Sequence, residues 1–276
     1  MIRSFTGTAV LVLLLAGCGG SDSSLNQIGP GPDLPPLQET LVPTLKIAKP
    51  TGWGDQTPTV PAGFTVTAMA TDLQIPRQVL VLPNGDILVA EGRGGHAPKL
   101  RPKDVIAGVI KKQGNTGVDS GNRITLLRDA DNDGRAEVRT GRKLTDLPAG
   151  PINHHWTKSL TASADGLTLF VGIGSNSNVG ERGMAVEEER AVVWAIDRQT
   201  GAHRTMASGI RNPTALAIEP LTSALWTVVN ERDEIGPQAS PDYLTSVREG
   251  AFYGWPYSYW GQNVDPRVHP QRPDMV

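Results

Sequence analysis

The sequence predicts an all-β fold, and three observations support this prediction. The 276 residues include 31 glycines and 22 prolines, which favours many short elements joined by tight turns and argues against an all-α bundle. Apolar residues alternate along short segments that end at turn residues, as in half-buried strands. One plan of segments recurs three times along the chain, which is typical of a repeated β architecture.

Charge and cysteine content limit the class of protein. Lys and Arg number 26 and Asp and Glu number 28, so the formal net charge is -2, with both signs interspersed. No broad basic field is available for nucleic acid, and we expect no nucleic-acid partner. The single cysteine cannot form an intramolecular disulfide, so burial of apolar side chains must hold the core together.

The N-terminus has the pattern of a secreted, lipid-anchored protein. Arg3 precedes the apolar run Thr8 to Ala16, which is too short to span a bilayer. The run ends in Leu15-Ala16-Gly17-Cys18, which resembles the bacterial lipobox. We expect residues 1–18 to be a lipoprotein signal peptide and Cys18 to carry the lipid, which would anchor the protein on the periplasmic side of a bacterial membrane. A plain secretory signal with an incidental cysteine is the alternative.

Residues 19–61 are rich in Gly, Ser and Pro, including the run GPGPDLPP at 29–36. Proline at this density cannot continue a helix or a central strand. We therefore interpret residues 19–61 as a tether and residues 62–276 as the folded domain.

Three segments of this domain share one plan: an apolar alternating strand, a turn, and a second, more continuously apolar strand. They are residues 78–91, 159–174 and 215–231. Each pattern indicates a hairpin with a buried second strand. A more polar hairpin is expected after each of them, at residues 123–140, 192–205 and 243–253.

Two hairpins make a four-stranded unit, and such units repeated radially form a β-propeller with the first strands around a central channel. A sandwich or a stack of separate hairpins is the alternative. A propeller blade takes about 40 to 50 residues, so residues 62–276 supply about four blades. We expect them to be the front part of a larger propeller. The insertions at 92–121 and 175–190 exceed what compactness requires and are expected to be functional.

The most informative stretch, NHHWTK at 153–158, lies directly before the first strand of the second unit and hence at the channel. His155 is a candidate base; the alternative, more common for a histidine in a loop that enters a strand, is a satisfied structural group. Metal binding by His154 and His155 together is disfavoured because neighbouring side chains on an extended chain point apart.

The equivalent loop of the next unit contains Arg211 and Asn212. Arginine binds carboxylates bidentately, and asparagine offers both a donor and an acceptor. With His155 they form a candidate site for an anionic, carbonyl-bearing ligand. The alternative is that Arg211 ties neighbouring blades together through backbone carbonyls.

The order of several motifs resembles the soluble pyrroloquinoline-quinone-dependent sugar dehydrogenases, in particular the sorbosone dehydrogenase branch. The motifs are HWTK, SADGLTLFVGIGSNSN, SGIRNPTALAIEP, NERDEIGP and REGAFYGWPYSYWG. The resemblance implies a six-bladed propeller that oxidises a sugar or polyol hydroxyl or aldehyde. It also implies pyrroloquinoline quinone (PQQ) in the central cavity, a Ca²⁺ ion, and an external electron acceptor.

The same resemblance implies roles for individual residues. His155 matches the base that removes the substrate hydroxyl proton, and Arg211 and Asn212 match contacts to the quinone. Gly236 and Pro237 resemble the backbone-carbonyl segment that holds Ca²⁺, although here that pair is displaced by three residues relative to the family pattern.

Two motifs and two competing functions stay open. The DADNDG run at 129–134 has the start of a calcium loop, but its twelfth position is Thr140 rather than Glu and its flanks alternate as strands, which favours a polar hairpin turn over a calcium site. The Tyr/Trp-rich segment 253–261 suits either packing or stacking on a sugar. The competing functions are a non-catalytic propeller lipoprotein that binds a ligand or partner, and a calcium-dependent lactonase-like propeller that would use carboxylates such as Glu91 and Glu231.

Overall fold

The computed structural model divides the chain into two compact units, residues 1–49 and 50–276. The structure describes parts of the second unit only. The described residues are 52, 54–71, 73–95, 121–136, 138–140, 144–150, 152–156, 158–234 and 241–276. The predicted signal peptide with Cys18, and the predicted calcium-binding pair Gly236 and Pro237, lie outside them.

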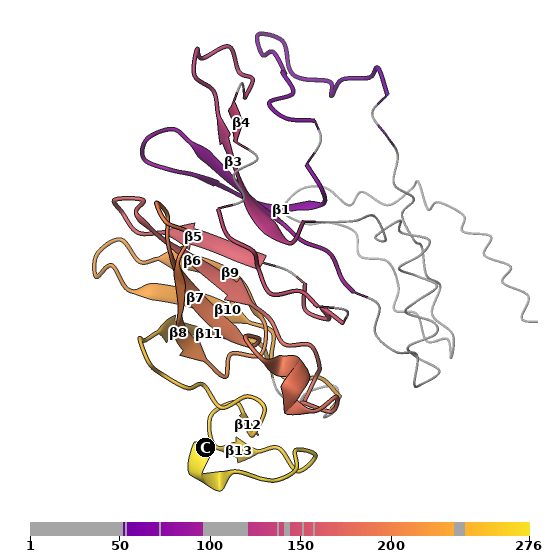
Figure 1. Ribbon diagram of the computed structural model, residues 1–276, viewed down its shortest axis with the longest axis vertical. Helices are drawn as coiled ribbons and strands as arrows, with labels where there is room; N and C mark the ends of the chain where they lie inside the picture. The colour runs from indigo at the N-terminus through magenta and orange to yellow at the C-terminus, as the bar shows by residue number, and fades with distance from the viewer. Residues whose placement is uncertain are drawn as a thin grey trace, which may run out of the picture. The chain divides into compact units, whose positions relative to one another are not determined.

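The first blade is a four-stranded antiparallel sheet in which strand order follows chain order (Figure 1). Its strands are β1 (Pro76–Val81), β2 (Ile87–Glu91), β3 (Arg123–Arg128) and β4 (Val138–Thr140). Strand β2 is buried along most of its length, as its continuous apolar sequence predicts. The turn between β1 and β2 contains Gly85 at φ +84°, a conformation that glycine adopts without steric cost.

The second blade repeats this plan. It consists of β5 (Lys158–Ala162), β6 (Thr168–Ile173), β7 (Val192–Asp197) and β8 (His203–Ser208), again antiparallel and in chain order. One apolar core joins the two blades and contains Leu88, Ile124, Leu160, Leu169 and Trp194. The inner strands are linked by Gln78 on β1, whose side-chain amide donates to the Leu160 carbonyl (3.1 Å) and accepts from its N–H (3.0 Å).

The third sheet has three strands, β9 (Pro213–Ile218), β10 (Leu225–Val229) and β11 (Tyr243–Val247). The hairpin predicted over residues 243–253 is therefore wrong. After β11 the chain turns and runs parallel to β8: the Ser208 N–H donates to the Ala251 carbonyl (3.0 Å), and the Tyr253 N–H donates to the Ser208 carbonyl (2.9 Å). The sequence predicted the polar turn at Glu249-Gly250. The segment after this turn pairs with the edge of β8 and does not return along β11.

Short elements complete the described part of the chain. They are the 3₁₀ turns η1 (Met184–Glu187) and η2 (Pro273–Met275) and the two-residue strands β12 (Ser258–Tyr259) and β13 (Asn263–Val264). Among the described residues, no helix combines the length and the apolar character needed to cross a membrane. Two complete four-stranded blades with adjacent inner strands confirm the predicted propeller architecture.

Candidate active site

The loops before β5 and β9 meet because their strands are neighbours. The Ser159 hydroxyl of β5 donates to the Pro213 carbonyl of β9 at 2.8 Å. His155 and Asn212 both pack against Gly174, just beyond the end of β6. A Cβ atom at Gly174 would overlap His155 Cβ and Asn212 Oδ1, so this approach requires a residue without a side chain. The structure thus brings together the histidine and the asparagine that the sequence singled out.

His155 is held at three points. Its backbone N–H donates to the Ser175 carbonyl (3.1 Å), and its own carbonyl accepts from Arg190 Nη2 (3.1 Å). Its ring nitrogen Nδ1 lies 2.9 Å from Ser175 Oγ. His155 is half-buried, whereas the neighbouring His154 is exposed, as expected for adjacent residues on an extended chain.

The environment keeps the His155 imidazole neutral. Burial lowers its pKa well below the ordinary value of 6.5, and the positive charges of Arg211, His154 and Arg190 lower it further. A neutral imidazole retains one unprotonated ring nitrogen, which is the state a general base requires.

Arg211 is 1% exposed, and all five of its N–H donors have acceptors. Nε and Nη2 donate to the carbonyl and the side chain of Asn178, at 3.1 and 2.9 Å. Nη1 donates to the carbonyls of Asn230 (3.1 Å) and Glu231 (2.5 Å). The remaining Nη2 donor forms an ion pair with Asp233 at 2.7 Å. Arg211 therefore ties two loops together, as the alternative interpretation proposed, but its Asp233 partner is a carboxylate that is 70% exposed.

The hydrogen-bonding groups of Asn212, unlike those of Arg211, are not all paired within the described residues. Its Nδ2 donates weakly to Asn230 Oδ1 at 3.4 Å, while its buried Oδ1 has no hydrogen-bond partner within the described part of the chain. Buried acceptors are normally satisfied. Asn212 Oδ1 is therefore a buried acceptor, packed against Gly174, whose hydrogen bond is not made among the described residues.

Sequence reasoning included Asn153 only within the stretch 153–158, without a role of its own, and did not assign Ser175 or Arg190 to this site. Arg190 is 4% exposed and donates to the carbonyls of Gly174 (2.7 Å) and Pro148 (2.8 Å) and to Asn153 Oδ1 (2.7 Å). No motif marks Arg190, because its partners, mostly backbone carbonyls, come from loops that are distant in the sequence. The available signal was the long insertion 175–190 itself, which contains both Ser175 and Arg190.

The acidic run at 129–134 forms a polar turn. Carboxylate oxygens of Asp129, Asp131 and Asp133 lie within 4.8 Å of one another. Each of these residues also accepts a backbone N–H of the same turn, such as Gly134 N–H to Asp129 Oδ2 at 2.9 Å. The other carboxylate oxygen of Asp129, Oδ1, is buried without a hydrogen-bond partner among the described residues.

The carboxylates that a lactonase-like site would use are engaged separately. Glu91 is fully buried and accepts from Arg123 Nε (3.1 Å) and the Thr125 hydroxyl. Glu231 accepts from the Arg232 N–H (2.8 Å), and burial raises the pKa of its carboxyl group. In the described residues, Glu91 and Glu231 do not belong to a common metal-compatible cluster.

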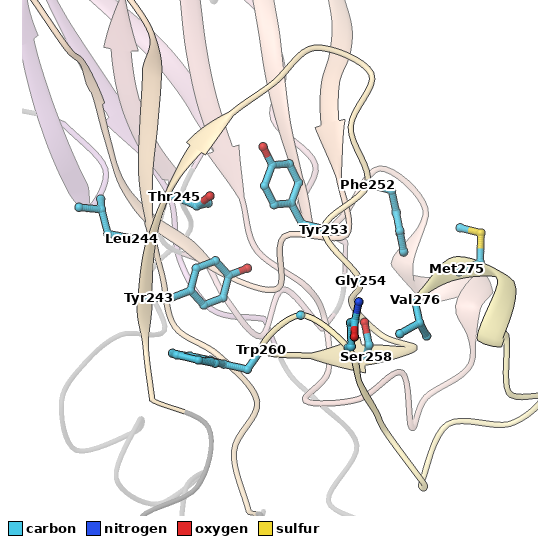
Figure 2. A pocket seen from close by; sticks show the side chains of 12 residues that line it. Tyr243, Leu244, Thr245, Phe252, Tyr253, Gly254, Ser258, Trp260, Met275 and Val276 are labelled. Atoms are coloured by element: carbon cyan, nitrogen blue, oxygen red, sulfur yellow. The ribbon is translucent and has the colours of Figure 1, made fainter.

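The Tyr/Trp-rich segment contains both a packing residue and cavity residues. Trp255 is buried, and its Nε1–H donates to the Asn178 carbonyl (2.9 Å). Tyr253, whose hydroxyl donates to the Ser246 carbonyl (2.5 Å), and Trp260, which is 52% exposed, line a cavity of about 530 Å³ with Tyr243 of β11 and the C-terminal residues (Figure 2). His155, Arg211 and Asn212 do not line that cavity. The chemistry-bearing loops and this cavity are thus separate features.

Comparison with known proteins identifies the family. A family model described as Glucose / Sorbosone dehydrogenase matches residues 108–275, which include both site loops. The chain belongs to this family.

Individual relatives are distant. The aldose sugar dehydrogenase YliI of Escherichia coli is 37% identical over 67 residues, 24% of this chain and 16% of that protein. An uncharacterized protein of Borreliella burgdorferi is 22% identical over 224 residues, 74% of this chain and 57% of that protein. The solved holo form of the pyranose dehydrogenase PQQ domain from Coprinopsis cinerea is 19% identical, with a TM-score of 0.42 over 75% of this chain and 60% of that structure. The chain thus spans just over half the length of the Borreliella relative.

Proposed function

We propose that the protein oxidises a sugar or polyol, with PQQ as the hydride acceptor and His155 as the general base. The observation that carries the proposal is a neutral imidazole packed beside a buried Arg-Asn pair, on the two loops that precede the neighbouring inner strands β5 and β9. Family membership and the activity named for the Escherichia coli relative support it.

The described residues fit an anionic quinone in two respects. Asn212 Nδ2 makes only a long hydrogen bond, 3.4 Å to Asn230 Oδ1, so this N–H donor can serve a quinone or carboxylate oxygen. Arg211 has one donor on an exposed carboxylate, Asp233, which a ligand carboxylate can replace without disturbing the other four hydrogen bonds. The proposed Ca²⁺ ligands Gly236 and Pro237 lie outside the described residues, so no step is routed through the ion.

In the proposed reaction, His155 takes the hydroxyl proton of the substrate. Because Nδ1 lies on Ser175 Oγ, Nε2 is the ring nitrogen that can meet the substrate. PQQ, when bound, would supply the acceptor for the hydride that leaves the carbon bearing that hydroxyl. The substrate thus loses one hydrogen as a proton to His155 and one as a hydride, which carries both electrons of the oxidation.

The proposal includes the location. The lipobox pattern ending at Cys18 supports an extracytoplasmic, lipid-anchored protein on the periplasmic side of a bacterial membrane. A sugar substrate and a diffusible or membrane-borne electron acceptor would meet the site in that compartment.

The decisive experiment compares the His155→Ala and His154→Ala variants of the full-length protein after addition of PQQ and Ca²⁺. In the wild type we expect the bound quinone to give an absorption band that changes when sugar is added, because the sugar reduces the quinone. In His155→Ala, quinone binding should persist while dye reduction falls about 10²- to 10⁴-fold. His154→Ala, the matched control, should change the rate little. An unchanged rate in His155→Ala would refute the base assignment, and the absence of any sugar-reducible band would favour a ligand-binding or lactonase-like propeller.

A further inference from the structure

We propose that Ser175 is a positioning residue that fixes His155 in the tautomer with hydrogen on Nδ1, leaving the Nε2 lone pair for the substrate. The assignment concerns the proton position in the free protein, and its catalytic meaning rests on the proposed function.

The hydroxyl hydrogen of Ser175 can be located from its neighbours. Ser175 Oγ lies 2.6 Å from the Ser177 carbonyl oxygen, and both residues are buried. Two oxygen atoms approach this closely only when a hydrogen lies between them, and a carbonyl cannot supply it. The Ser175 hydroxyl therefore donates to the Ser177 carbonyl.

Because its hydrogen is used in that bond, Ser175 Oγ can act toward His155 only as a hydrogen-bond acceptor. At 2.9 Å, His155 Nδ1 must then be the donor, because two facing acceptors would repel each other. A neutral imidazole carries one N–H, so hydrogen on Nδ1 means that Nε2 is unprotonated. The opposite tautomer would leave a buried Nδ1 lone pair against the lone pairs of the serine.

The backbone of Ser175 connects both site loops. Its N–H donates to the Arg211 carbonyl (2.8 Å), and its carbonyl accepts the His155 N–H (3.1 Å). The following residues are fixed by Glu187, which accepts from the Asn176 N–H (2.7 Å) and from the Ser177 hydroxyl. Because these hydrogen bonds hold the backbone on both sides of Ser175 and hold Ser177, the Ser175 hydroxyl has little freedom to turn from the Ser177 carbonyl toward His155.

The test is a long-range ¹H–¹⁵N correlation spectrum of histidine-labelled protein without cofactor, with the His155 signals assigned by a His155→Gln variant. We expect Nδ1 of wild-type His155 to give a protonated signal and Nε2 an unprotonated one. In Ser175→Ala the preference should weaken, and Ser175→Thr, which keeps the hydroxyl, should restore it. Ser159→Ala is the matched control, since it removes another buried hydroxyl that donates to a carbonyl, away from His155.

In turnover, Ser175→Ala should lower kcat roughly tenfold at unchanged KM, short of the ~10²-fold or greater effect of losing the base itself. Hydrogen on Nε2 in the wild-type spectrum overturns the inference, even if Ser175→Ala fails to fold. The expected tautomer in a protein without dehydrogenase activity would refute the proposed function and leave the proton assignment standing. The opposite tautomer in an active enzyme would refute this inference alone.

Discussion

Arg190 and Arg211 are both buried guanidinium groups placed two residues before a strand, yet their partners differ in kind. Arg190 donates to neutral oxygens: the carbonyls of Gly174, Pro148 and His155 and the side chain of Asn153. Arg211 also donates to carbonyls, but one of its nitrogens meets the exposed carboxylate of Asp233. Arg190 therefore joins loops through neutral oxygens only. Arg211 also has an exposed carboxylate partner, Asp233, which a ligand carboxylate could replace.

The electrostatic states of the site follow from these surroundings. Desolvation lowers the pKa of Arg190 to about 10, an effect that the nearby Glu187 carboxylate partly opposes. Burial is the largest cause that lowers the pKa of His155. The charges of both arginines lower it further, with a larger contribution from Arg211 than from Arg190. Under the proposed function we therefore expect the two arginines to perform different tasks, Arg190 mainly in stability and Arg211 mainly in ligand binding.

The largest expected effect is on stability. Arg190→Met should lower the free energy of unfolding by about 3 kcal/mol or more, because several buried carbonyls lose their donor and each unsatisfied group costs about 1 to 3 kcal/mol. Denaturant unfolding monitored by fluorescence measures it. Arg204→Met is the control, since Arg204 pairs with Glu249 on the surface and should cost little. Equal losses in the two variants would contradict the role assigned to Arg190.

A smaller effect is expected for Arg211→Lys, and it should appear in binding. An ammonium cannot reproduce the fork of five donors, so PQQ affinity should fall about tenfold or more. Titration of the apo protein with the quinone measures the affinity, and thermal unfolding measures the accompanying loss of stability. Asp233→Asn is the matched variant: it removes the competing carboxylate and should leave affinity unchanged or raise it. If Arg211→Lys reduces only stability, Arg211 is a tie between blades and the distinction from Arg190 disappears.

The smallest effect is in pH dependence. Because the folded-state pKa of His155 lies well below 6.5, the unfolded chain takes up a proton on this histidine that the folded chain does not. Its contribution to stability is therefore fully present above pH 6.5 and declines as the pH falls toward the folded-state pKa. Unfolding curves of wild type and His155→Gln between pH 7 and 5 should show the steeper decline in the wild type. Parallel curves would mean that His155 titrates normally in the folded protein, and hence that neither burial nor the arginine charges lower its pKa.

The fold was accessible from the sequence where its signals are local. The turns at Asn84-Gly85 and Asp165-Gly166 divide the predicted hairpins as the structure has them, with Gly85 and Gly166 at positive φ. The polar turn at Glu249-Gly250 gave an equally local signal, but the segment after it pairs with β8 rather than with β11. A turn motif predicts that the chain reverses direction. It does not predict which strand the segment after the turn will pair with.

The sequence by itself determined the repeated strands, their turns and the family motifs that carry His155, Arg211 and Asn212, because turn chemistry and apolar alternation act between residues a few positions apart. Tertiary structure alone decided what surrounds those residues. Arg211 finds Asn178, 33 positions away, and Arg190 finds Pro148, 42 positions away. Buried polar groups must be satisfied by whichever loops the packed blades bring within hydrogen-bond distance, so the proton on His155 and the one exchangeable donor of Arg211 are set by contacts between distant loops.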